Sequence, residues 1–177
     1  MSGDNIDIAK WIHFAMADYT AAINMVLLHK PIPIEIVCYH CQQAAEKLLK
    51  AYIIAKNETL IKTHDLVVLL NQCRQYSADF DSHARSCMAL TTFASHSRYP
   101  SNIEITEQQM KQAVKDVEGI ISFMTPLFKE MGYTISSQKK QKKSLLAQLD
   151  EAKAEVAEHK SKLPGKVSKK KTDEIVR

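Results

Sequence analysis

Side chains able to do chemistry are concentrated in two short segments, Cys38–Lys50 and Thr63–Leu66. In the first, Glu46 stands four residues before Lys50, which is the favourable order for an ion pair within one helix, although such a pair contributes only about 0.3–0.5 kcal/mol. In the second, His64 could pair with a nearby carboxylate as an acid–base group or contact a ligand phosphate. The competing interpretation is that His64 is a cap or a polar tether between helices.

Positively charged residues near these segments form a candidate phosphate-binding surface. Two lysines lie on successive turns of one predicted helix, and an arginine followed by a tyrosine lies at the end of another. If the cations converge on one groove, they would hold a phosphate group by charge-assisted hydrogen bonds. The candidate ligand-binding residues are Lys47, Lys50, His64, Arg98 and Tyr99. The lysines have a competing interpretation as salt bridges to Glu46 or Asp18.

The cysteines predict neither a metal centre nor a disulfide scaffold. Cys38 and Cys41, with His40 between them, lie close enough to suggest a metal, but they share one apolar helical face and lack the second pair of ligands that a structural zinc site needs. A disulfide-stabilised protein would be smaller and poorer in core residues. We therefore expect reduced, buried thiols and neither a bound metal nor a cofactor. The chain also has no glycine-rich phosphate loop.

Composition indicates one helical domain followed by a tail. The chain has 177 residues, 45% of them hydrophobic, with only four glycines and five prolines, which is enough for one core but too little for two. An apolar run from Ala21 to Leu28 is interrupted by Asn24 and is too short to span a membrane or to act as a signal peptide. We expect a cytoplasmic protein that does not enter a membrane.

Charge is distributed unevenly along the chain. Residues 1–135 contain 12 Lys and Arg against 14 Asp and Glu, whereas residues 136–177 contain 12 against 6. The basic tail could attract nucleic-acid phosphates through the release of counterions, or it could simply keep the protein in solution. Leu145 and Leu149 could support one short helix in the tail, and the last dozen residues are predicted to be disordered.

Hydrophobic spacing predicts an all-α fold, an up-and-down bundle of four to five helices. Apolar residues recur every three or four positions, and no segment sustains the period of two that indicates a strand. Small residues between Ala84 and Ser95 indicate close approach of another helix, which could belong to a second subunit. We predict helices from Asp4 or Asp7 to His29, from Pro33 to Lys56, from an N-cap at Thr63 through Cys73, from Ala78 to Arg98, and from a capping box at Thr106 towards Gly132.

Four segments in this order closely resemble the HEPN domain family. They are Ala15–Asp18, Cys38–Ala51, Thr63–Leu66 and Ser97–Pro100. The resemblance covers residues 5–131 and leaves the tail, residues 132–177, outside it. It implies a helical bundle that usually forms a homodimer. The family contains RNases, toxin components, and non-catalytic members paired with minimal nucleotidyltransferases.

The catalytic members of the family that this chain resembles share a motif. In this motif an arginine is followed, after four to six residues, by a histidine that is able to act on an RNA 2′-hydroxyl. No histidine stands at this spacing after Arg74, Arg85 or Arg98. The sequence therefore favours a dimeric binding module that engages a partner protein, plausibly a minimal nucleotidyltransferase as in toxin–antitoxin pairs, and that contacts nucleotide or RNA. The alternatives are an RNase that uses Arg98 with His96 or His64, and a structural protein whose tail lies on an acidic surface.

Overall fold

The computed structural model describes residues 8–96 and 104–135, and all of these residues belong to one compact unit that spans residues 1–141. The described part of the chain contains α-helices and one 3-10 helix but no strand. The predicted all-α bundle is therefore confirmed. No helix in this part combines the length and the apolar character that crossing a membrane requires.

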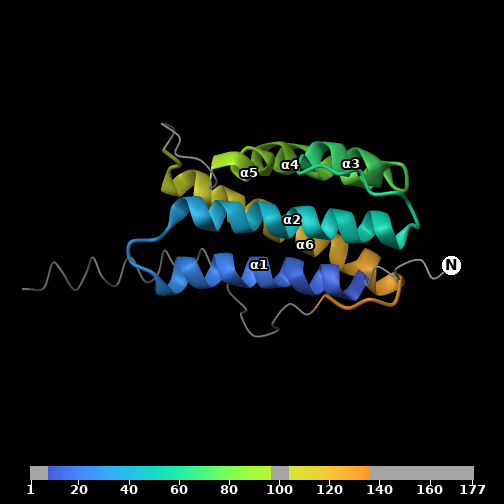
Figure 1. Ribbon diagram of the computed structural model, residues 1–177, viewed down its shortest axis with the longest axis horizontal. Coiled ribbons are helices and arrows are strands. Elements are labelled where there is room, and N and C mark those ends of the chain that lie inside the picture. Colours follow the sequence, from blue (N-terminus) through green and yellow to red (C-terminus); the bar gives the residue numbers. More distant parts are fainter. Residues whose placement is uncertain (1–7, 97–103, 136–177) are drawn as a thin grey trace, which may run out of the picture. The chain divides into compact units, whose positions relative to one another are not determined.

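Two long antiparallel helices lie side by side in the bundle (Figure 1). They are α1 (Ile8–Leu28) and α2 (Ile34–Ala55). Between them lie Pro31 and Pro33, which have no backbone N–H to donate, so the chain turns here as predicted. Asn57 ends α2 in the left-handed backbone conformation, with φ of 58°, which asparagine tolerates better than most residues.

The N-cap of the third helix was predicted at the wrong residue. α3 (Leu66–Arg74) is capped by Asp65, whose carboxylate accepts hydrogen bonds from the backbone N–H groups of Val67 and Val68 at 2.8 and 3.4 Å. The Thr63 hydroxyl instead accepts from the backbone N–H of Asp65 at 3.0 Å. His64 therefore lies in the loop before α3, directly ahead of the capping residue.

The segment predicted as one helix from Ala78 is divided into three. It consists of a 3-10 helix, η1 (Ala78–His83), then α4 (Ala84–Thr91) and the short α5 (Phe93–His96). Serine and threonine hydroxyls bond to nearby backbone groups throughout this segment, and such bonds compete with a regular helical ladder. α4 contacts α3 and α6, and its Cys87 and Leu90 are buried, whereas its Ala89 is exposed.

The last helix of the bundle has the predicted capping box. α6 (Glu107–Glu130) begins after Thr106, whose hydroxyl accepts from the backbone N–H of Gln109 at 3.2 Å, while the Gln109 side chain accepts from the backbone N–H of Thr106 at 2.8 Å. Two residues after the helix ends, Gly132 adopts the left-handed backbone conformation, with φ of 85°. The N–H of Tyr133 then bonds to the Phe128 carbonyl at 2.8 Å, which satisfies one of the carbonyls left open at the helix end.

α2 lies at the centre of the bundle, with α1 beside it, α3, α4 and α5 along its other edge, and α6 behind it in this view (Figure 1). Aromatic rings from three elements meet at its C-terminal half, where the Tyr52 ring lies 4.9 Å from that of Phe80 and 6.3 Å from that of Phe128. Most of the α2 surface is consequently buried. Polar side chains on this helix must find partners within the protein.

Candidate functional site

A connected row of polar side chains runs along α2 and joins it to α1 and to the loop before α3. We call this row the α2 polar stripe. Its members are Asp18, His40, Gln42, Gln43, Glu46, Lys47, Lys50 and His64. Each member is hydrogen-bonded to at least one other, so the row is continuous from α1 to the loop before α3.

Glu46 is the centre of the inner half of the stripe. Its carboxylate is only 5% exposed and accepts hydrogen bonds from Lys50 Nζ at 2.7 Å and from Gln42 Nε2 at 2.8 Å, and it lies 3.0 Å from His64 Nδ1. Gln42 is fully buried, and its amide also lies 3.3 Å from the His64 carbonyl oxygen. Glu46 therefore ties the loop before α3 to the middle of the bundle.

The environment of Glu46 keeps its carboxylate ionised. Burial alone would raise the pKa of Glu46, but hydrogen bonds from Lys50 and Gln42, the positive charge of Lys50, and the His64 hydrogen bond together lower this pKa below its ordinary value. An ionised carboxylate can only accept hydrogen bonds, so His64 Nδ1 must be the donor. This assignment leaves His64 Nε2 as a lone-pair acceptor while the ring is neutral.

Asp18 is the centre of the outer half, which repeats the same set of groups. Lys47 Nζ donates to the Asp18 carboxylate at 2.7 Å, and His40 Nδ1 lies 2.9 Å from it. Lys47 also donates to Gln43 Oε1 at 2.9 Å, and the Gln43 amide donates to Gln42 Oε1 at 2.8 Å. A carboxylate with one lysine and one histidine thus occurs twice, and two glutamines connect the copies.

The candidate ligand-binding residues differ in how accessible they are. Lys47 and Lys50 form the salt bridges that were their competing interpretation, with Asp18 and Glu46 respectively. The His64 side chain is 60% exposed. Hydrogen bonds join Lys47, Lys50 and His64 into one network, while their role in ligand binding stays a prediction. Arg98 and Tyr99 lie outside the described residues, and so does the side chain of His96.

Sequence reasoning missed the pairing of His40 with Asp18 in the outer half of the stripe. It considered His40 only beside the two cysteines and Asp18 only as a partner for lysine, whereas these two side chains bond to each other. The pairing depends on the register of α1 against α2, which no local pattern specifies. One local signal was present, because two consecutive glutamines in a helix with so much buried surface imply an internal hydrogen-bond network.

The cysteines are core residues, as predicted. All four are buried and free. Burial raises the pKa of both Cys38 and Cys87 to about 12, which keeps these thiols protonated and unreactive at neutral pH. Across residues 8–96 and 104–135, no group of three or more His, Cys, Asp or Glu side chains is arranged to hold a metal ion.

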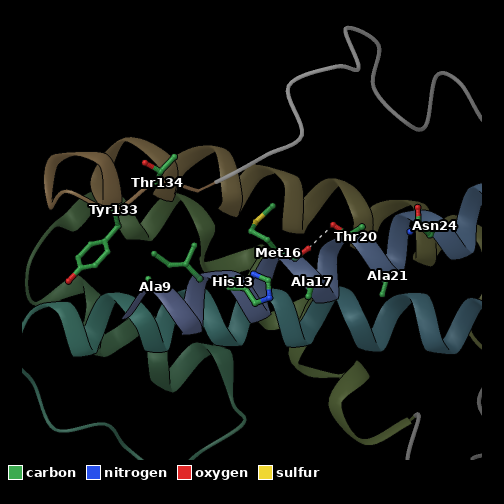
Figure 2. Close-up of a pocket in the computed structure, with 10 residues that line it drawn as sticks. Ala9, His13, Met16, Ala17, Thr20, Ala21, Asn24, Tyr133 and Thr134 are labelled. Atoms are coloured by element: carbon green, nitrogen blue, oxygen red, sulfur yellow. Dashed lines mark hydrogen bonds between the residues drawn. The ribbon is translucent and has the colours of Figure 1, made fainter. Parts of the chain in front are cut away.

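An open groove of about 680 Å³ follows one face of α1 beside the segment that comes after α6 (Figure 2). None of its lining residues is an aspartate, glutamate, lysine or arginine. Half of them are alanine or threonine. The lining residues are Ala9, Ile12, His13, Met16, Ala17, Thr20, Ala21, Asn24, Tyr133 and Thr134.

Comparison with known families gives one match. The family model described as HEPN domain matches residues 8–130, which contain every member of the α2 polar stripe and most of the groove. No curated protein and no solved structure matches the chain.

Proposed function

The chain belongs to the HEPN domain family, and we propose that it is a dimeric, non-catalytic binding module of that family. In this proposal the module engages a partner protein, a minimal nucleotidyltransferase of the kind found in toxin–antitoxin pairs, and contacts a nucleotide or RNA along the α2 polar stripe. The groove on α1 is the proposed dimer contact.

The main support for a non-catalytic role is that the stripe neutralises its own cations. Lys47 and Lys50 each lie 2.7 Å from a carboxylate oxygen of the same chain. RNA cleavage requires a cation that is available to the charge developing on the phosphorus in the transition state. Both lysines are paired, and no histidine stands at the family spacing after any arginine, so the stripe lacks the groups that this family uses for RNA cleavage.

Support for the dimer comes from the chemistry of the groove. Two copies of one helix can pack closely around a two-fold axis when the side chains on the shared face are small and carry no like charges. The α1 groove meets the charge condition, since its lining contains no acidic residue, lysine or arginine, and three of its α1 residues are alanines. Ala17 is an exposed lining residue, and an aspartate there would place like charges opposite each other in such a dimer.

The dimer is tested by light scattering during size-exclusion chromatography of the full chain. We expect a mass of twice the 20.0 kDa chain, and a shift to the monomer for Ala17→Asp. The matched control is Ala89→Asp, which introduces the same side chain at an exposed position of α4 outside the groove and should leave the dimer intact. A monomeric wild-type protein at micromolar concentration would contradict this part of the proposal.

The partner is tested by affinity purification of the tagged chain from its host, followed by mass spectrometry. Recovery of a small nucleotidyltransferase is the expected result. Recovery of RNA with no protein partner would instead favour the RNase alternative or binding by the basic tail.

One observation favours the RNase alternative. The hydrogen bond to Glu46 fixes the orientation of the His64 ring, and a catalytic base must be held in a fixed orientation. The RNase alternative is tested by incubating the full chain with RNA alongside His64→Gln and Arg98→Ala. We expect no cleavage by the wild-type protein. Cleavage that disappears in either variant would overturn the non-catalytic assignment, whereas a contaminating nuclease would act equally in all three samples.

A further inference from the structure

We propose that His40 and His64 together form a proton-dependent contact site for the phosphodiester backbone of a single-stranded nucleic acid. This inference rests on the proposed function, because it names the ligand chemistry of the α2 polar stripe and the condition under which the ligand binds. Neither lysine of the stripe is required to leave its salt bridge.

The two imidazole rings are held in the same way. His40 Nδ1 lies 2.9 Å from the Asp18 carboxylate, and His64 Nδ1 lies 3.0 Å from the Glu46 carboxylate. Because each Nδ1 faces an acceptor, each Nε2 points away from it across the ring. Within the described part of the chain, neither Nε2 has a hydrogen-bond partner. The His64 side chain is 60% exposed and that of His40 is 23% exposed, so His64 is the more accessible of the two.

Protonation changes what these nitrogens can bind. In the neutral ring Nε2 is an acceptor, and it repels a phosphate oxygen, which is also an acceptor. In the charged ring Nε2 becomes a donor, and a hydrogen bond from a cationic donor to a phosphate oxygen is among the stronger kinds. Each histidine is therefore converted by one proton from a group that disfavours phosphate into one that binds it.

The charged side chains around each histidine determine how far one added proton changes the local charge. Around His40 the facing charged groups are Asp18 from α1 and Lys47 from α2, which neutralise each other, and the Tyr39 ring lies 5.7 Å from its own. Around His64 they are Glu46 and Lys50, which also neutralise each other, together with the adjacent Asp65, whose carboxylate is engaged at the α3 N-terminus. A proton taken up by His40 consequently gives its surroundings a net positive charge, whereas a proton taken up by His64 offsets the charge of Asp65.

The spacing of the two sites suits a chain of phosphates rather than one phosphate. His40 precedes Glu46, the partner of His64, by six residues on α2, which corresponds to about 9 Å along the helix at 1.5 Å per residue. A stacked single strand advances about 3.4 Å per nucleotide, so the same length covers two to three phosphates. Because His40 is held by Asp18 on α1 and His64 by Glu46 on α2, we infer that two phosphates of one strand contact the two rings.

The inference is tested by fluorescence anisotropy of a labelled hexauridylate with the full-length protein at about pH 5.5 and about pH 8, the range in which histidine changes its charge. Lysine and arginine remain charged throughout this range, but the basic tail also contains His159, so His159→Gln is introduced into every sample to keep the contribution of the tail equal at both values. We expect affinity at the lower pH to be roughly tenfold higher. The slope of log affinity against log salt should steepen by about 1.4, which is about 0.7 for each added phosphate contact.

The decisive variant is the double substitution His40→Gln with His64→Gln, which should remove most of the pH dependence of binding. The matched control is His29→Gln, an exposed histidine after the end of α1 and outside the stripe, which should keep the full effect. If the double variant retains the wild-type pH dependence, the inference is wrong. Circular dichroism establishes that each variant is folded.

Competition identifies the ligand class. Unlabelled hexauridylate and its deoxy counterpart should both displace the probe at the lower pH, because the site reads the backbone. Uridine monophosphate and inorganic phosphate should displace it only at much higher concentration. If uridine monophosphate competes as well as the hexamer, the site binds a phosphate monoester and the phosphodiester assignment is wrong.

A second measurement needs no variant. The Cε1 proton resonances of His40 and His64 should move when hexauridylate is added to the wild-type protein at about pH 6, and unchanged resonances would refute the inference. Light scattering on the same samples separates the two proposals. A monomer that shows the histidine-dependent effect would refute only the proposed dimer, whereas a dimer without this effect would refute only the two-histidine site.

Discussion

Replacing Glu46 with glutamine removes one negative charge from the interior while preserving the shape of the side chain. Its partner Lys50 has only 10% of its side chain exposed, so in Glu46→Gln a buried ammonium group loses its counter-ion. Removing one partner of a buried ion pair typically costs about 3–5 kcal/mol. With a shift of roughly 2–4 °C per kcal/mol for a chain of this size, the melting temperature should fall by about 6–20 °C.

The assay is urea unfolding followed by the fluorescence of Trp11, the only tryptophan of the chain. Its ring centroid lies 6.0 Å from Lys50 Nζ, so the probe is next to the perturbed group. The matched control is Glu130→Gln at an exposed position near the end of α6, which should change the free energy of unfolding by no more than about 0.5 kcal/mol. A loss for Glu46→Gln as small as that of the control would refute the argument.

Two further measurements examine the cause of the loss. Because the pKa of Glu46 is lowered in the folded protein, the contribution of this residue to stability is present above the ordinary carboxyl pKa of 4.5 and is lost as the pH falls through the folded value. The stability of Glu46→Gln should therefore decline less in acid than that of the wild type. Adding Lys50→Met to Glu46→Gln should restore part of the lost stability, because no unpaired charge then remains.

Two further substitutions and one reactivity measurement test other parts of the structure. Asp65→Ala removes the cap of α3 and should cost about 1 kcal/mol in urea unfolding; no loss would mean that another group caps this helix. Thr91→Val leaves the backbone N–H of Leu66 without its 3.0 Å acceptor and should cost about 1–3 kcal/mol by the same assay, so a neutral effect would show that this hydrogen bond is unimportant. The four cysteines, with the pKa of Cys38 and Cys87 raised to about 12, should resist a thiol reagent at about pH 8 in the native protein and react fully in denaturant; rapid native reaction would contradict their burial.

How much of the fold could be predicted depended on the range of the interaction. Helix periodicity is local, and so is the capping box at Thr106, and both were predicted correctly. The start of α3 was not, because Thr63 and Asp65 are both good caps and only the path of the loop decides which one reaches the helix N-terminus. The break at Thr92 was also missed, because it reflects competition between side-chain and backbone hydrogen bonds within a segment of good helical periodicity.

The contacts of the candidate site could likewise be predicted only where they join residues close in the sequence. Glu46 and Lys50 are four residues apart on one helix, so their pairing follows from the sequence alone. The pairing of His64 with Glu46 was one of several alternatives, because nothing local fixes how the loop before α3 folds back on α2. The pairing of Asp18 with His40 was not anticipated, because it depends on the register of α1 against α2.

The continuity of the α2 polar stripe restricts how this sequence can change by single mutations. Each carboxylate serves a lysine and a histidine, and the two glutamines join the two sets, so a substitution at Asp18 alters the surroundings of Gln43 and, through it, of Glu46. Substitutions at the two ends of the stripe should therefore have strongly non-additive effects. These eight positions should be inherited largely as a block, and a variant that exchanges one member should be tolerated best when a second member changes with it.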